Sequence, residues 1–480
     1  MRRRHVVLAA ITAALLVSAA PAAAHVENLG SSWLTESAHH AGWYTPSPES
    51  KSDNIDILGS VSRTRFDNTY RNSDLAFWGR LAYAGHYDGF QIIDAGNPRK
   101  PKQIVDFACP GSQHDVSVWG GLLFVSVETP RSSPACDSTT QSPGFEGIRI
   151  FDVSNPRAPY LVKGVPTDCG SHTHTLVPDP RQGRVLLYVA SYTSVTSDLP
   201  VSAYGNECRR YEADGSAAQD KISVVEVPLR DPSKASVVSE PHFPQRPYGG
   251  THPGEGRTGC HDITVFMELE IAGAACMGEG QIWDISDLEN PRTIGRVFNP
   301  NVEFWHSATF SYDGRRVVFG DEAGGGTGPA CRTSDPKTRG ALWFYDVRSI
   351  DSLDEEVVTP RSSWKVPRIQ EKLTPEQAQD PNCTMHNFNT LPTKHGDVLV
   401  SSAYAAGTTM VDFSNASRPR EVGYLDPHGA NTWSAYWYNG YVFTNDGGRG
   451  VDILKVRDRA TRGARKLPFS NPQTQLFQIR

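Results

Sequence analysis

The 480-residue sequence predicts an all-β fold, and three observations lead to this prediction. The chain contains 42 glycines and 34 prolines, which separate short runs of β-branched and aromatic residues. Four such runs recur in the same order along the chain, as in proteins built from structural repeats. The set can be counted seven times. A four-stranded antiparallel unit repeated seven times predicts a seven-bladed β-propeller.

The second unit shows the pattern most clearly. Residues 114–118 read as a first strand, and a Trp-Gly-Gly turn leads into a second strand over residues 122–127. A third strand is expected at 147–153, and after a Ser-Asn-Pro turn a fourth at 160–165. Short apolar runs bounded by glycine, proline and asparagine are typical of antiparallel hairpins.

Seven segments align as first strands. They are Ser73-Asp-Leu-Ala-Phe, His114-Asp-Val-Ser-Val, His174-Thr-Leu-Val, His261-Asp-Ile-Thr-Val, His306-Ser-Ala-Thr-Phe, His386-Asn-Phe-Asn and Trp433-Ser-Ala-Tyr-Trp. The seventh unit ends after its third strand, near residues 450–456. We expect the isolated strand Ile55-Asp-Ile-Leu to complete that blade, because closing the ring removes its open edges. The predicted organisation is a signal peptide (1–24), an N-terminal extension (25–54), the propeller (55–458) and a C-terminal tail (459–480).

The third strands resemble those of the LVIVD-repeat family of secreted bacterial propellers. The resemblance rests on segments such as Phe90-Gln-Ile-Ile-Asp-Ala and Phe151-Asp-Val-Ser-Asn-Pro-Arg-Ala-Pro, and it covers roughly residues 55 to 456. It implies the fold and no particular activity. A more distant resemblance is to selenium-binding proteins and methanethiol oxidases, which carry His-Asp pairs on inner strands and a proposed copper site. His114-Asp115 and His261-Asp262 match that pair, but the active cysteine motif of those proteins has no clear match here.

The N-terminus predicts export. Basic residues follow Met1, an apolar stretch covers residues 6–20, and an Ala-x-Ala site precedes His25. Either the general secretory or the twin-arginine route would fit. Since no other apolar run approaches about 18 residues, we expect no membrane span after cleavage.

Eight cysteines in an exported chain predict disulfides. Four of them come shortly before a first-strand histidine, and the other four follow a second strand. We therefore expect neighbouring cysteines to pair as Cys109–Cys136, Cys169–Cys208, Cys260–Cys276 and Cys331–Cys383. Ligation of a metal by cysteine is less favoured, because the sequence contains no C-x-x-C motif.

The repeated histidines predict a metal site. First strands line the channel of a propeller, so His114, His174, His261, His306 and His386 should converge on its axis. Convergent imidazoles suit a transition metal ion such as copper, iron or zinc. His172 should share a strand face with His174 and could replace it. Units one and seven carry Ser73 and Trp433 instead, which would leave one side of the ion open.

The same rim collects further polar groups. Asp115 and Asp262 are candidates to orient neighbouring imidazoles. Carboxylates and one more imidazole are expected where second strands end, at His86, Glu128, Asp321, Glu322 and Asp446. The long insertions at 193–220, 232–259 and 351–385 fall on this rim too, where loops accumulate function.

Two functions remain open from the sequence. The first is a metal-dependent enzyme, such as a copper or iron oxidase acting on a small-molecule substrate. The second is a non-enzymatic, extracellular binding or scaffold propeller that uses its loop-rich rim, with the histidines only sealing the channel through hydrogen bonds. The formal net charge of -6, without a basic run, argues against a nucleic-acid partner. We expect a monomer.

Overall fold

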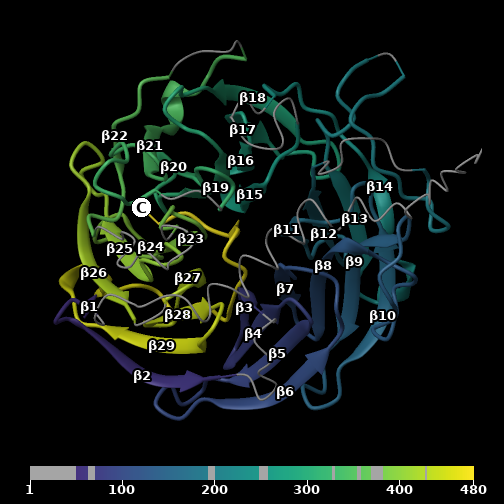
Figure 1. Cartoon of the computed structure of the whole chain (residues 1–480), viewed down its shortest axis with the longest axis horizontal. Helices are drawn as coiled ribbons and strands as arrows, with labels where there is room; N and C mark the ends of the chain where they lie inside the picture. Colours follow the sequence, from purple (N-terminus) through teal and green to yellow (C-terminus); the bar gives the residue numbers. More distant parts are fainter. Residues whose placement is uncertain are drawn as a thin grey trace, which may run out of the picture.

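Seven antiparallel sheets surround a central channel in the computed structural model of the chain (Figure 1). The model describes residues 50–62, 71–192, 200–213, 215–247, 258–326, 330–353, 358–368, 382–427 and 430–479. The predicted signal peptide (1–24) and most of the predicted extension (25–54) lie outside the described residues. The prediction of a seven-bladed propeller is confirmed.

Blades 1 to 6 each contain four strands in chain order from the channel outward. Blade 1 consists of β3 (Asn72–Trp78), β4 (Leu81–His86), β5 (Gly89–Asp94) and β6 (Lys102–Ala108). Blade 2 consists of β7 (Val116–Trp119), β8 (Leu122–Arg131), β9 (Phe145–Asp152) and β10 (Tyr160–Pro166). Blade 3 consists of β11 (Thr173–Asp179), β12 (Arg184–Ala190), β13 (Ser223–Pro228) and β14 (Ser236–Ser239). Blade 4 consists of β15 (Asp262–Phe266), β16 (Ile271–Cys276), β17 (Glu279–Asp284) and β18 (Arg292–Val297). Blade 5 consists of β19 (Trp305–Phe310), β20 (Arg316–Asp321), β21 (Leu342–Asp346) and β22 (Ser362–Trp364). Blade 6 consists of β23 (Phe388–Thr390), β24 (Val398–Ser402), β25 (Thr408–Asp412) and β26 (Arg420–Asp426).

Blade 7 is completed by the N-terminal strand, as predicted. Its strands β27 (Thr432–Tyr438), β28 (Tyr441–Asp446) and β29 (Gly450–Val456) come from the end of the repeat region, and β2 (Ile55–Val61) supplies the outer strand. β2 pairs antiparallel with β29, so that Ile55 lies opposite Val456. Just before it, β1 (Ser50–Lys51) pairs with β26 of blade 6. The N-terminal segment therefore joins the last two blades and covers two sheet edges.

The hydrophobic core lies between neighbouring blades. One cluster, for example, packs Val177 and Tyr188 of blade 3 against Val265 and Trp283 of blade 4. Each fully buried side chain of this size contributes roughly 1.5–3 kcal/mol to the free energy of unfolding. Because the packing of the sheets fixes the first strands, side chains at their ends have defined positions around the channel.

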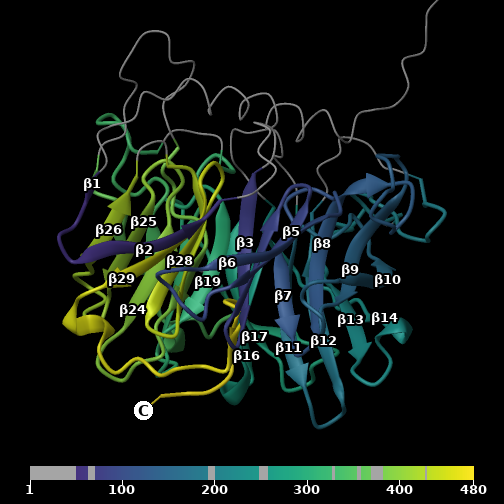
Figure 2. The ribbon, with the colours of Figure 1, turned by 90° about the horizontal axis from the view of Figure 1, so that it is seen from below.

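The C-terminal segment lies across the channel at the rim opposite the histidines (Figure 2). β30 (Phe469–Ser470) pairs antiparallel with β3, and β31 (Thr474–Gln475) pairs parallel with β15. Between and beyond them, side chains bond to free edges of first strands. The Asn471 amide bonds to both the N–H and the C=O of Val118, at 2.7 and 3.0 Å, and the Gln475 amide does the same at Phe310, at 3.0 Å each. These contacts tie the segment to blades 1, 2, 4 and 5.

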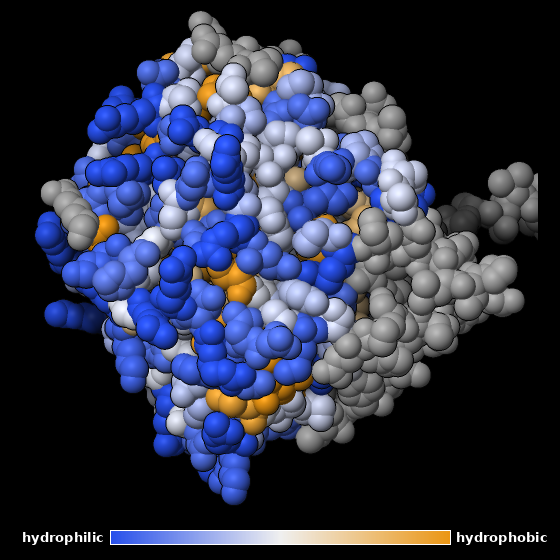
Figure 3. Space-filling view, turned by 90° about the vertical axis from the view of Figure 1, so that its left-hand side faces the viewer, coloured by the Kyte–Doolittle hydropathy of each residue, from blue (hydrophilic) through white to orange (hydrophobic). Residues whose placement is uncertain are grey.

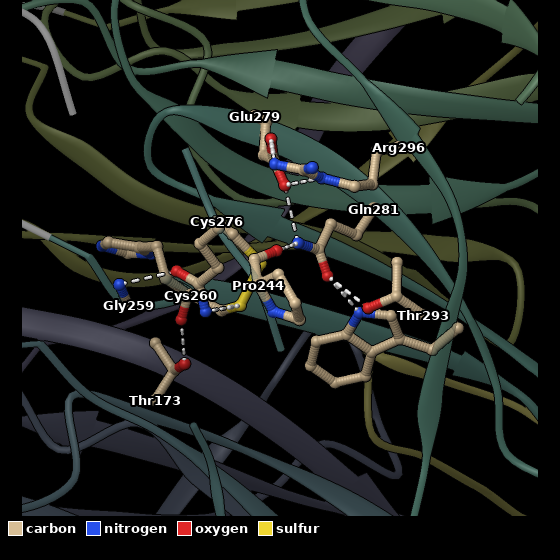
Figure 4. The surroundings of a disulfide bond; sticks show 12 residues. Thr173, Pro244, Gly259, Cys260, Cys276, Glu279, Gln281, Thr293 and Arg296 are labelled. Atoms are coloured by element: carbon tan, nitrogen blue, oxygen red, sulfur yellow. Dashed lines mark hydrogen bonds and ion pairs between the residues drawn. A yellow bond between two sulfur atoms is a disulfide. The ribbon is translucent and has the colours of Figure 1, made fainter. Parts of the chain in front are cut away.

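All four predicted disulfides are confirmed. They join Cys109 to Cys136, Cys169 to Cys208, Cys260 to Cys276 and Cys331 to Cys383. The bond between Cys260 and Cys276 links the entry of β15 to the end of β16, directly before His261 (Figure 4). Four disulfides are consistent with an extracellular location.

Short 3-10 turns are the only helices in the described part of the chain: Pro232–Lys234, Met267–Leu269, Val347–Ser349 and Arg459–Thr461. No helix among these residues is long and apolar enough to cross a membrane. The flank formed by blades 5 and 6 is mainly hydrophilic, with scattered apolar residues (Figure 3).

Candidate metal centre

Four histidines from four consecutive blades lie side by side at one end of the channel. His172, His261 and His386 directly precede or approach the first strands of blades 3, 4 and 6, and His306 lies within β19 of blade 5. The distances between ring centres are 4.3 Å from His172 to His261, 3.8 Å from His261 to His306 and 4.4 Å from His306 to His386. All four side chains are buried. We call His172, His261, His306 and His386 the histidine group.

In three of these rings the Nδ1 atom is held by a neighbouring group. His172 Nδ1 lies 2.5 Å from Glu128 Oε2, and His386 Nδ1 lies 2.5 Å from the carbonyl oxygen of Trp433. His306 Nδ1 is hydrogen-bonded to Ser307 Oγ. Because a carbonyl oxygen can only accept, His386 donates from Nδ1, and its neutral ring keeps a lone pair on Nε2. Such partners fix the ring orientation of histidines that bind metals.

The Nε2 atoms face one another and one carboxylate. The His172 and His261 rings share a hydrogen bond of 2.7 Å between their Nε2 atoms. The Glu322 carboxylate spans the other two rings: Oε2 lies 3.6 Å from His306 Nε2, and Oε1 lies 3.5 Å from His386 Nε2. His261 Nδ1 is buried and has no hydrogen-bond partner among the described residues. Nitrogen and oxygen donors are thus concentrated in one small volume.

Two sets of potential ligands overlap in this volume. His261, Asp262 and His306 each offer one donor atom, and these atoms lie within 4.8 Å of one another. His306, Glu322 and His386 form a second set by the same measure. Imidazole with carboxylate is a donor combination that suits copper, iron and zinc. The residues present therefore fit a transition metal ion.

Burial keeps most of the histidine group neutral. It lowers the pKa of His386 to about 3 and the pKa values of His261 and His306 well below the usual range, and neighbouring histidines add to the last two effects. Burial also opposes protonation of His172, but the Glu128 carboxylate outweighs it and raises the pKa of His172. Neutral imidazole is the form that binds a metal.

The buried carboxyl groups shift in the opposite direction. Burial raises the pKa of Glu322 to about 8 and that of Asp262, beside the charge of Asp115, to about 7. Asp262 accepts a hydrogen bond of 3.2 Å from Ser307, which also contacts His306. Attraction to the His172 imidazolium opposes both shifts, and a bound cation would oppose them further.

Two of the five histidines predicted as ligands lie apart from the group. The backbone of His114 is left-handed, with φ of 57°, and its Nδ1 lies 2.6 Å from the carbonyl oxygen of His86 in blade 1. His174 lies deeper, where Nε2 contacts Ser117 Oγ at 2.7 Å and Nδ1 contacts Ser126 Oγ at 2.8 Å.

Strand register explains why His172 occupies the place expected for His174. The His172 N–H donates to the carbonyl of Ala190, which is paired with Thr173. The His261 N–H donates in the same way to Ala275, which is paired with Asp262. His172 and His261 are thus equivalent in their blades. His174 lies two residues, or about 6.6 Å, further along the strand.

The other rim residues divide into two kinds. Glu128 and Glu322 contact the histidine group, and Asp262 reaches it through Ser307. The remaining ones hold local structure. Asp115 bonds to the backbone and ring of His174, and His86 lies between Asp88 and Asp106. Asp321 and Asp446 accept backbone N–H groups mainly from neighbouring loops.

Tyr404 is the main residue of the site that the sequence did not single out. Its hydroxyl donates to Glu322 Oε1, and its ring centre lies 4.5 Å from that of His386. Tyr404 follows β24, so comparing the ends of all second strands would have pointed to it. It has a left-handed φ of 43°. Ser112, His114, Cys169 and Met277 on this rim do as well, and such backbone strain gathers at functional sites.

No protein-family model and no curated protein sequence matches the chain. Similar solved structures include a proposed 6-phosphogluconolactonase from Bacteroides uniformis, with 12% identity and a TM-score of 0.48 over 82% of this chain and 95% of that one. A functionally unknown protein from Desulfotomaculum acetoxidans has 12% identity and a TM-score of 0.47, covering 85% and 94%. A protein from Lactobacillus plantarum has 11% identity and a TM-score of 0.47, covering 83% and 96%. Identities of this size carry no activity over to this chain.

Proposed function

We propose that this chain is a secreted propeller that binds one transition metal ion, copper, iron or zinc, through the histidine group and uses it as an oxidase centre for a small-molecule substrate. The observation that carries the proposal is the orientation of the imidazoles. Three rings are held at Nδ1, and two overlapping sets of donors, His261-Asp262-His306 and His306-Glu322-His386, each gather within 4.8 Å. Rings held at one nitrogen beside a second group of donors are typical of histidines that bind metals.

The difference between the two ends of the channel supports substrate access to the ion from the histidine rim only. The C-terminal segment bonds to first strands at the opposite rim. At the histidine rim, blades 7, 1 and 2 add no imidazole to the two ligand sets found among the described residues. An ion held by the residues of these sets, from blades 4 to 6, therefore keeps a side on which a substrate can bind, as catalytic metal sites require.

The chain's own residues assign the remaining tasks. A bound copper or iron ion would supply the change of oxidation state that an oxidase needs. His261, His306 and His386 provide neutral nitrogen donors, and His172 is hydrogen-bonded to His261 beside them. Glu128 orients His172, and the Trp433 carbonyl orients His386. Tyr404 Oη carries a proton next to Glu322 Oε1, at the edge of the site.

Elemental analysis tests the proposal. Protein purified without chelator should contain about one equivalent of copper, iron or zinc, and H306A/H386A should contain almost none while keeping the circular dichroism of the wild type. Oxygen uptake by the loaded protein with a panel of small reductants then tests the oxidase activity. If the wild type holds no metal and takes up none on dialysis, the histidines only seal the channel, and the rim serves for binding a partner.

A further inference from the structure

We propose that Glu322 is itself a ligand of the ion held by the histidine group, and that Tyr404 is the residue that positions it. This inference rests on the metal site proposed above. It adds a carboxylate to a set of imidazoles, and it gives a role to a buried tyrosine that the histidine spacing does not indicate.

The distances fit coordination of one ion. Glu322 Oε2 lies 3.6 Å from His306 Nε2, and Glu322 Oε1 lies 3.5 Å from His386 Nε2. Both separations exceed a hydrogen bond, so the three side chains are neighbours without a direct bond. Two donor atoms that each lie about 2.1 Å from a tetrahedral ion are about 3.4 Å apart. The carboxylate oxygens and the two nitrogens thus have the spacing of atoms around a shared ion.

The burial of the Glu322 carboxylate also favours a bound cation. Glu322 is only 4% exposed. Its two oxygens face the Tyr404 hydroxyl and the Nε2 atoms of His306 and His386. A buried carboxylate needs a compensating charge or a proton. A divalent ion between Glu322 and these imidazoles provides that charge at the position where the donor atoms converge.

Tyr404 is placed to fix the orientation of this carboxylate. Its hydroxyl donates to Glu322 Oε1, the oxygen nearest His386. The backbone of Tyr404 is anchored to blade 7 by two hydrogen bonds with Thr432, at 3.0 and 3.2 Å. The phenol therefore extends from a rigid turn between blades 6 and 7 to an acid supplied by blade 5. Such a contact holds a ligand in position without itself binding the metal.

Cobalt(II) binding to the purified full chain tests this inference. The dissociation constant is measured by competition with a chelator, and the visible spectrum reports the ligands around the ion. We expect E322Q to bind Co(II) at least about 100-fold more weakly and to change the spectrum, because a charged ligand is lost. We expect Y404F to weaken binding about 10–100-fold, as is usual for residues that orient a ligand. Y404F keeps the ring that contacts His386 and removes only the hydroxyl.

Two matched controls accompany these variants. E303Q removes a carboxylate three residues before His306 that pairs with Arg339, and Y192F removes a hydroxyl from a ring that contacts His172. Both should bind Co(II) like the wild type. If E322Q does not fold, E322D, which keeps the charge but draws the carboxylate back, should show the loss of affinity instead.

Each outcome decides between distinct ideas. Wild-type affinity and an unchanged spectrum in E322Q would exclude Glu322 as a ligand while leaving the histidine site intact. A weak E322Q beside a normal Y404F would remove the positioning role of Tyr404. If the wild type takes up no Co(II), the metal site itself is wrong, and the inference falls with it.

Discussion

Exchanging His172 or His174 for glutamine gives a matched pair of variants. The two residues lie two positions apart at the start of β11, and their side chains differ mainly in depth within the channel. His172 belongs to the histidine group, whereas His174 bonds to Ser117 and Ser126 of blade 2. We expect H172Q to lose metal affinity and H174Q to keep it.

The size of the effect can be estimated from the number of ligands. Structural zinc sites with four ligands bind with about 10–16 kcal/mol at neutral pH. Each ligand then accounts for about 3 kcal/mol, or roughly 100-fold in Kd. H174Q should instead lower the free energy of unfolding by about 1–3 kcal/mol, because two buried hydroxyl groups lose a partner.

Zinc competition with a chromophoric chelator measures the Kd, and denaturant unfolding of the metal-free protein measures stability. The predicted pattern is a large change in Kd for H172Q alone. An equal loss of affinity in H174Q, or none in H172Q, would show that the ligand set has been read from the wrong depth of the channel.

Three further predictions concern the scaffold. C260S/C276S should lower the free energy of unfolding by about 2–4 kcal/mol and weaken metal binding, because the disulfide directly precedes His261. Chemical denaturation measures the first effect and chelator competition the second. Unchanged affinity would show that the disulfide does not support the metal site. Deleting residues 469–480 should increase amide exchange at Val118 and Phe310, because their N–H groups donate to Asn471 and Gln475. Unaltered protection in hydrogen-exchange mass spectrometry would mean that the segment does not seal the channel. I55D places a charge in the buried β2–β29 pairing and should lower the melting temperature by several degrees. I57D, at an exposed position of the same strand, should lower it much less, and equal effects would contradict closure of the ring by β2.

The repeat pattern was sufficient to predict the fold. Alternating apolar strands and Asn-Pro turns define four-stranded units. Ile55–Val61 has the pattern of a fourth strand but belongs to no unit near it in the sequence, so it could be matched to the strand missing from blade 7. The disulfides could be predicted as well, because each cysteine had a fixed position relative to a first or second strand. Both kinds of feature depend on local pattern and on the symmetry of the ring.

The histidine group was only partly predictable, because depth and backbone direction leave weak traces in sequence. A shift of two residues along a strand keeps the same face, so His172 and His174 look alike until the pairing with Ala190 is known. The left-handed backbone of His114 turns its ring toward blade 1, and the neighbouring residues give no sequence signal for this backbone conformation. The contacts of Asn471 and Gln475 with first strands follow no repeat, so residues 459–480 read only as a tail.

X-ray absorption spectroscopy of the metal-loaded protein tests the central proposal most directly. We expect a first shell of nitrogen and oxygen atoms at about 2.0–2.2 Å, with the outer-shell scattering of at least three imidazole rings. H306A/H386A should lose most of that imidazole signal. A first shell of oxygen atoms without imidazole scattering would contradict a metal centre built by the histidine group.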